Sequence, residues 1–159
     1  MTLIALSLDD KYQSERGRLY LTGSQALVRA AMLQYLRDRA AGLNTASFIS
    51  GYRGSPLHNI DKELWRANRF LAERAIHFVP GINEDLAATA CLGTQQSAMF
   101  GESTHDGVFA MWYGKGSGLD RSIDAVRHGN LHGSSQFGGV LALVGDDHAM
   151  KSTDVPAAS

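Results

Sequence analysis

The chain has 159 residues and a net charge of −1, and 44% of its residues are hydrophobic while 19% are charged. This composition is typical of one globular domain with its own core and excludes an intrinsically disordered protein. Since lysine and arginine form no cluster, neither nucleic acid nor an anionic membrane surface is an expected partner.

Strand-like and helix-like segments alternate along the chain. Residues 1–17 are expected to form a polar lead-in segment, and the predicted domain covers residues 18–159. Residues 18–22 are a strand candidate. A helix should follow as far as Ala41, and one of its faces carries Ala26, Ala30, Leu33, Leu36 and Ala40.

A second strand is expected at residues 46–50. After Pro56 the chain becomes amphipathic, with apolar residues at helical spacing: Ile60, Leu64, Ala67 and Leu71. Further strands are expected at residues 76–79, 107–113 and 139–144. Each is apolar at successive positions, which is the pattern of a parallel strand covered on both faces. The alternation predicts a doubly wound α/β fold, with a mainly parallel sheet and helices on both faces.

The N-terminal apolar run at residues 3–8 lacks a preceding basic segment and is too short to span a bilayer, so a cytoplasmic protein is expected. The single cysteine, Cys91, excludes an intramolecular disulfide framework. It also excludes an iron–sulfur cluster that is ligated by this chain alone.

Three predicted strands end in unusual loops, and ligands of open α/β sheets bind outside the carboxyl ends of strands. The first loop is GYRGSP at residues 51–56. Its glycines permit backbone conformations that other residues avoid. Ser55 could offer a hydroxyl and Arg53 a guanidinium to a ligand, although a simple turn with Ser55 as a helix cap fits equally well.

The second loop, GKGSGLDRS at residues 114–122, does not match the GxGxxG spacing of dinucleotide-binding loops. The three glycines are explained at least as well by a backbone that closely approaches a flat ring or a partner subunit. In that interpretation Lys115 and Arg121 lie in solvent. The third loop, GDDH at residues 145–148, could ligate a divalent cation. Acidic turns of this kind are more often capping or solvent-facing, so no metal ligands are assigned.

The most informative stretch is residues 81–90, GINEDLAATA. It follows a short apolar run and indicates a tight turn and then a helix built from small residues. Asn83 fits the helix cap, and Glu84 and Asp85 could simply complement the helix dipole. Alternatively, a carboxylate at the start of a buried helix is what a thiamine diphosphate enzyme requires beside ring nitrogen N1′ of the cofactor.

Taken together, these segments resemble the 2-oxoacid:ferredoxin oxidoreductase family. GYRGSP is similar to the GYPGTP-type turn of that family, and Asn83-Glu84 is similar to its NE-containing helix start. The chain most resembles the N-terminal region of the indolepyruvate-specific branch, through ERG at 15–17, YLTG at 20–23, MWYGKG at 111–116 and GDDH at 145–148.

The resemblance implies that this region is a thiamine diphosphate pyrimidine-binding domain in which Glu84 is the catalytic residue at N1′. It implies that Ser55 binds the substrate and that Gly54, Gly114 and Gly116 lie against the cofactor. Arg53 stands where the family commonly has proline, and its guanidinium makes it a second candidate for substrate binding. The implied reaction is oxidative decarboxylation of indolepyruvate or another aryl 2-oxoacid. Coenzyme A takes the acyl group, and ferredoxin takes the electrons.

Other parts of such an enzyme are missing from the sequence. It has neither the GDG motif of a diphosphate–Mg²⁺ site nor the cysteines of [4Fe-4S] clusters. We therefore expect the chain to be the N-terminal part of a longer polypeptide or one subunit of a complex. We also expect it to form a homo-oligomer and to be inactive alone. The alternative is a non-catalytic α/β module that binds a nucleotide or assembles a complex.

Overall fold

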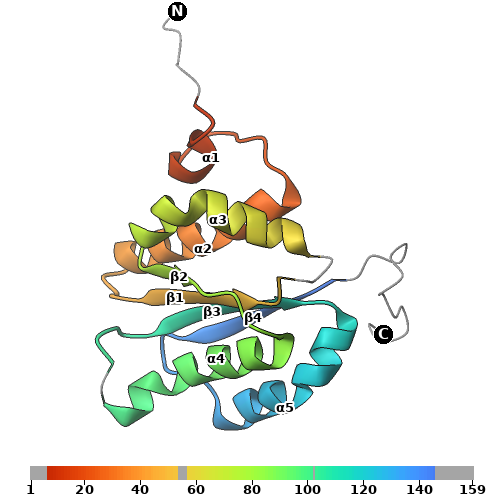
Figure 1. Ribbon diagram of the computed structural model, residues 1–159. Helices are drawn as coiled ribbons and strands as arrows, with labels where there is room; N and C mark the ends of the chain where they lie inside the picture. The colour runs from red at the N-terminus through yellow and green to blue at the C-terminus, as the bar shows by residue number, and fades with distance from the viewer. Residues whose placement is uncertain (1–6, 54–56, 102, 146–159) are drawn as a thin grey trace, which may run out of the picture.

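The computed structural model describes residues 7–53, 57–101 and 103–145, which form an α/β structure of three layers (Figure 1). Within these residues the strands make one all-parallel sheet in the order β2-β1-β3-β4. They are β1 (Ala46–Gly51), β2 (Ile76–Phe78), β3 (Val108–Gly114) and β4 (Gly139–Val144). The predicted doubly wound parallel α/β fold is confirmed, and each of these strands lies within one residue of its predicted bounds.

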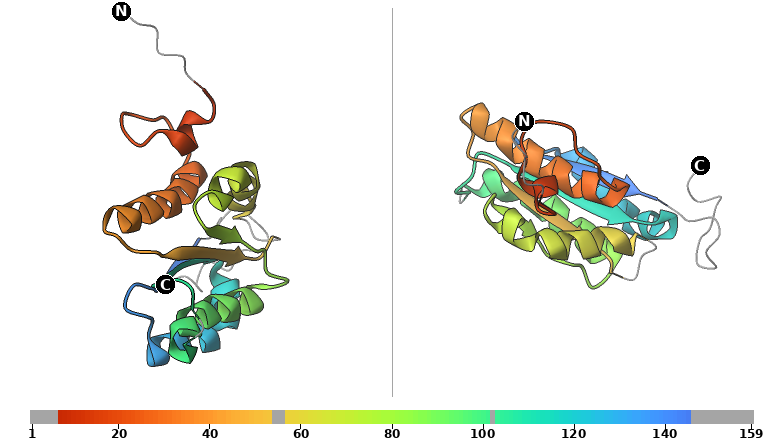
Figure 2. Two further views of the ribbon diagram at one scale, coloured as in Figure 1. Left: turned by 90° about the vertical axis from the view of Figure 1, so that its left-hand side faces the viewer. Right: turned by 90° about the horizontal axis from the view of Figure 1, so that it is seen from above.

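Helices cover both faces of the sheet (Figures 1 and 2). On one face lie α2 (Gly23–Ala40) and α3 (His58–Ala72), with the short α1 (Asp10–Gln13) packed on them. On the other face lie α4 (Glu84–Gln96) and α5 (Gly116–His132), and the 3-10 turn η1 (Ser97–Phe100) continues α4.

The core between the sheet and the α2–α3 layer is built from large aliphatic and aromatic side chains. The predicted apolar stripe of α3 is confirmed, since all four of its members are at most 4% exposed: Ile60, Leu64, Ala67 and Leu71. The stripe expected on α2 is wrong. Ala26 and Ala30 are exposed, and the helix instead buries Val28, Ala31 and Met32. The packing against α3 therefore determines which face of α2 is buried.

The core on the opposite face is built from small residues. Ala87, Ala88 and Cys91 of α4 pack against Ala110 and Trp112 of β3. Because these alanines have short side chains, α4 lies close to the sheet, and its first turn is held beside the end of β3.

Two of the predicted strand features are wrong. Residues 18–22 form no strand, because Thr22 caps α2. Its side chain accepts a hydrogen bond from the Gln25 backbone, and the Gln25 side chain accepts one from the Thr22 backbone. β4 is present, but it is not covered on both faces. Val140, Leu141 and Val144 are 40–48% exposed, because β4 is the outer strand of the described sheet.

None of the helices in the described ranges combines the length and apolar character that crossing a membrane requires.

Candidate functional site

The carboxyl ends of β1, β2 and β3 meet at one edge of the sheet, because the strands are parallel. From β1 the chain proceeds to β2 on one side, and from β3 it proceeds to β4 on the other. β1 and β3 therefore flank the point where the strand order reverses, which is where ligands of open α/β sheets bind. A cleft of about 290 Å³ opens at this edge, and its lining comes from the segments that follow β1, β2 and β3: Tyr52, Ile82, Asn83, Glu84, Lys115, Ser117, Gly118 and Arg121.

Local interactions fix the backbone of Glu84 at this cleft. Asn83 caps α4 as predicted, since its Oδ1 accepts a hydrogen bond from the Leu86 backbone N–H at 2.8 Å. Glu84 is the first residue of the helix, and its backbone carbonyl accepts a hydrogen bond from Trp112 Nε1 at 3.0 Å. The buried indole of Trp112 thereby ties the start of α4 to the end of β3.

The side chain of Glu84 is buried but lines the cleft, with the residue only 6% exposed. No group in the described part of the chain hydrogen bonds to its carboxylate, whereas its backbone carbonyl is paired. Its oxygens are not among the buried polar atoms that lack a partner in the described residues, so the carboxylate reaches solvent through the cleft. Such a group indicates a place for a ligand that supplies the missing hydrogen bond.

Gly118 brings α5 against this carboxylate. A Cβ built on Gly118 would lie 2.6 Å from Glu84 Cγ and 3.0 Å from Glu84 Oε1, so any larger residue would displace the acidic side chain. The buried Ser122 fixes the same turn, because its hydroxyl donates to the Gly118 carbonyl at 2.8 Å. Gly118 therefore serves as part of the wall that holds Glu84, a role that the sequence pattern did not indicate.

The structure separates the other predicted site residues. Gly114 ends β3, and the Trp112 ring fills the space where its Cβ would lie. Gly116 is buried at the start of α5, and neither glycine lines the cleft. Arg53 is exposed after β1 and also lies outside the lining. Gly54 and Ser55 fall outside the described residues.

Lys115 and Arg121 join Glu84 in the cleft, although the sequence suggested only that they are solvated. Lys115 is the N-cap residue of α5, and its side chain makes no capping hydrogen bond. These residues share a cleft only because the segments after β1, β2 and β3 meet at one edge of the sheet, so local sequence carries no signal for the arrangement.

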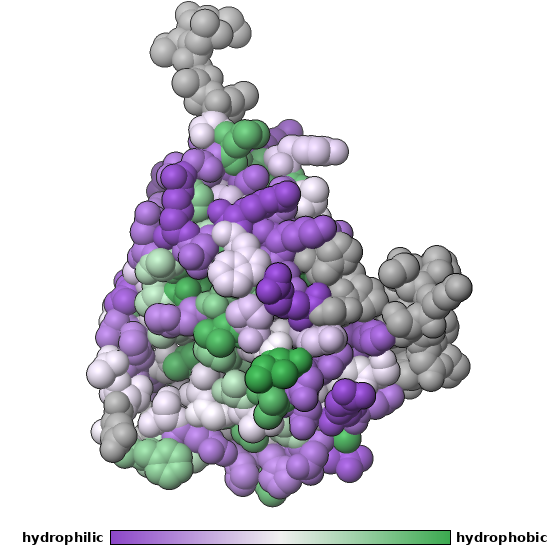
Figure 3. Space-filling view, viewed as in Figure 1, coloured by the Kyte–Doolittle hydropathy of each residue, from purple (hydrophilic) through white to green (hydrophobic). Residues whose placement is uncertain are grey.

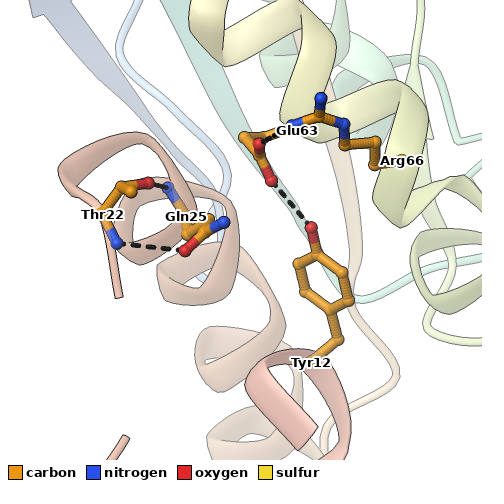
Figure 4. A network of polar contacts seen from close by, with 5 residues as sticks. All are labelled: Tyr12, Thr22, Gln25, Glu63 and Arg66. Atoms are coloured by element: carbon orange, nitrogen blue, oxygen red, sulfur yellow. Dashed lines mark hydrogen bonds and ion pairs between the residues drawn. The ribbon is translucent and has the colours of Figure 1, made fainter. Parts of the chain in front are cut away.

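Two other buried carboxylates, on α3, are fully engaged within the fold. The Tyr12 hydroxyl donates to Glu63 Oε2 at 2.9 Å, and Arg66 pairs with Oε1 of the same carboxylate (Figure 4). Burial would raise the pKa of Glu63, but these hydrogen bonds outweigh it and leave the pKa below its ordinary value. Asp61 accepts a hydrogen bond from the Tyr113 hydroxyl, and burial together with Asp61 raises the pKa of Tyr113.

A larger cavity of about 370 Å³ lies between α4, α5 and β4. Its lining is mostly apolar and includes Cys91, Trp112 and Val140, together with the buried amide of Gln95. Burial raises the pKa of the Cys91 thiol to about 12, which leaves the thiol protonated and unreactive at neutral pH.

The described residues contain no group of three potential metal ligands among histidine, cysteine, aspartate and glutamate. His128 and His132 do lie together on α5, with ring centroids 5.8 Å apart. The GDDH loop considered for metal binding lies, apart from Gly145, outside the described residues.

A scan against models of known protein families gave no match for this sequence. A search of curated proteins gave no match either.

Proposed function

We propose that this chain is the pyrimidine-binding domain of a thiamine diphosphate-dependent oxidoreductase that decarboxylates indolepyruvate or a related aryl 2-oxoacid. The acyl group would pass to coenzyme A and the electrons to ferredoxin. The observation that carries the proposal is Glu84, a buried carboxylate that opens into a cleft at the switch point of the sheet and has no donor in the described chain.

The residues of the cleft fit the pyrimidine ring of this cofactor. A ring nitrogen that shares a proton with Glu84 would supply the hydrogen bond that the carboxylate lacks. Gly118 leaves the side chain room beside α5, and Trp112 holds the backbone of Glu84 in place. When bound, thiamine diphosphate supplies the nucleophilic carbon that attacks the substrate carbonyl. The role of Glu84 is to hold or release the proton at N1′.

The surface beside the cleft supports assembly with other domains or subunits. Val79, Ile82 and Leu86 are 50% exposed or more, although they flank the start of α4. Figure 3 shows apolar residues gathered at the level of the sheet and α4 on one side of the molecule. Exposed apolar groups of this kind favour a protein partner. We propose further that partner domains carry the Mg²⁺ site and the [4Fe-4S] clusters. The complete enzyme would be a homo-oligomer in the cytoplasm.

The test is the turnover of the complete enzyme that contains this chain. Glu84→Gln removes the proton-sharing group at nearly constant volume, so turnover should fall at least about a hundredfold. Asp85→Asn is the matched control, because Asp85 is the adjacent first-turn carboxylate and does not line the cleft. If both variants keep normal turnover, or if Asp85→Asn alone abolishes it, Glu84 is not the catalytic carboxylate.

A further inference from the structure

The cavity between α4, α5 and β4 is a second place where this chain can hold a small molecule. Its volume is about 370 Å³, which lies within the range of small-molecule pockets. It extends to the amino end of β4, because Gly139, the first residue of that strand, lines it. Glu84 and Gln95 stand at opposite ends of α4, so about 16 Å of helix separates them. The cavity is therefore distinct from the cleft at Glu84.

Small side chains on three elements leave this space open. Ala88 of α4, Ala125 of α5 and Ala142 of β4 all line it. Protein interiors contain few voids larger than a water molecule, so a gap of this size between packed elements is unusual. Trp112 adds a flat aromatic surface to the wall, and Cys91 adds a neutral thiol. Such walls favour an aromatic ligand.

One buried acceptor in the wall of the cavity has no partner. Gln95 is 2% exposed, and its Nε2 donates to Thr94 Oγ1 at 3.0 Å and to the Val108 carbonyl at 3.1 Å. These two bonds fix the orientation of the amide. No described group donates to Gln95 Oε1. Since a buried carbonyl oxygen without a hydrogen bond costs free energy, a ligand that brings a donor to this oxygen is favoured.

The turn before β4 passes close to this oxygen. A Cβ built on Gly138 would lie 2.8 Å from Gln95 Oε1 and 2.5 Å from Ser135 Oγ, so only glycine lets the turn come this near. The neighbouring Ser134 and Gly139 line the cavity. The unpartnered oxygen therefore lies at the end of the cavity that this turn forms, and the apolar walls extend from it.

We propose that this cavity binds a small neutral aromatic molecule whose single O–H or N–H group donates to Gln95 Oε1. None of the described residues that line the cavity is charged, and a buried charge without a partner is costly, so the ligand is neutral. Val140 is 48% exposed and Ala142 is also exposed, so the ligand enters beside β4, the outer strand of the described sheet. The site is independent of the cofactor proposed for the cleft.

The experiment uses Trp112 fluorescence, since this indole is buried and lines the cavity. Trp65, the other tryptophan of the chain, is half-exposed on α3, and Trp65→Phe removes its signal. In this parent variant, phenol and toluene, which lacks a donor, should each give a saturable change. Gln95→Met should reduce the preference for phenol over toluene about fivefold, which is the contribution of one neutral hydrogen bond.

Ala142→Leu in the same parent tests the location of the site. The larger side chain would lie beside Trp112, which pairs with residue 142 in the register of β3 and β4. By filling the cavity it should weaken the binding of both ligands about tenfold. Ala30→Leu is the matched control, because Ala30 is an exposed alanine of α2 on the opposite face of the sheet, and it should bind both ligands like the parent.

The NMR signals of the Gln95 side-chain amide give a second measurement that needs no substitution of Gln95. Phenol should shift them, and toluene should shift them much less. Absence of a saturable response to either ligand, or equal affinities in Ala142→Leu and Ala30→Leu, would overturn the site. An unchanged preference for phenol in Gln95→Met, or equal amide shifts with the two ligands, would overturn the hydrogen bond to Oε1.

Discussion

The two faces of the sheet bury acidic side chains in different ways. On the α3 side, Glu63 is held by Tyr12 and Arg66, and Asp61 accepts a hydrogen bond from Tyr113. On the α4 side, Glu84 is buried to a similar extent, but no described group donates to its carboxylate. A carboxylate whose hydrogen bonds are made within the fold stabilises the fold. One that is left without a donor beside a cleft is available to a ligand.

The two cavities also differ in the chemistry of their linings. The larger one, of about 370 Å³, is mostly apolar, and its thiol is kept protonated by burial. The smaller one, of about 290 Å³, contains Glu84, Lys115 and Arg121 at the switch point of the sheet. The charged lining and the position in the fold, rather than size, identify the candidate site.

Among the substitutions that test this comparison, Gly118→Ala should have the largest effect on turnover. The new methyl group would meet Glu84 Cγ, so the acidic side chain should rotate out of place. The helix itself should tolerate the change, because alanine has a higher helix propensity than glycine. Turnover of the complete enzyme should fall about a hundredfold, as expected when a catalytic group is misplaced by about 1 Å.

Gly129→Ala is the matched control for that substitution. Gly129 is another glycine of α5, and its added Cβ would make an ordinary contact, 3.6 Å from Leu92 Cδ1. This variant should retain normal turnover. Equal turnover in the two variants would show that Gly118 does not position Glu84.

On the α3 side, Tyr12→Phe should affect stability instead. It removes the hydroxyl that donates to Glu63 and leaves a buried acceptor without that partner, so the free energy of unfolding should fall by about 1–3 kcal/mol. Tyr35→Phe removes a hydroxyl that is hydrogen bonded to no described residue, and its effect should stay within about 0.5 kcal/mol. Chemical denaturation of both variants measures the difference, and equal losses would contradict the assigned role of Tyr12.

A smaller effect is expected from acidification. The pKa of Glu63 lies below its ordinary value of 4.5, so its stabilising contribution is fully present above about pH 4.5 and is lost as the pH falls through the folded-state pKa. The stability difference between the wild type and Tyr12→Phe should therefore shrink on acidification. Denaturation curves at pH 7 and at progressively lower pH test this, and a difference that grows would show that Glu63 is not stabilised as its ionised form.

The sequence predicted those features whose signals are local. The apolar spacing of α3, the runs of β1 and β3, and the Asn83 cap all depend on neighbouring residues, and the structure has each of them. Residues 18–22 have an apolar pattern that resembles a strand, but Tyr20 is fully exposed and Thr22 caps a helix.

Features that depend on distant parts of the chain could not be predicted. Tyr12 meets Glu63 across 51 residues of sequence, and Tyr113 meets Asp61 across 52. The exposure of β4 follows from its place at the edge of the described sheet rather than from its apolar sequence. The helix start indicates Glu84 in the sequence, but Gly118 meets its carboxylate, and Lys115 and Arg121 line the same cleft, only because α5 packs beside α4.

The most direct test of the central claim compares the unfolding free energies of Glu84→Gln and Glu63→Gln in this chain at neutral pH. If Glu63 is held by the fold and Glu84 is reserved for a ligand, Glu63→Gln should cost about 1–3 kcal/mol, because it disrupts the hydrogen bonds to Tyr12 and Arg66. Glu84→Gln should remain within about 1 kcal/mol of the wild type, since no internal hydrogen bond is lost. A loss in Glu84→Gln as large as that in Glu63→Gln would contradict the account.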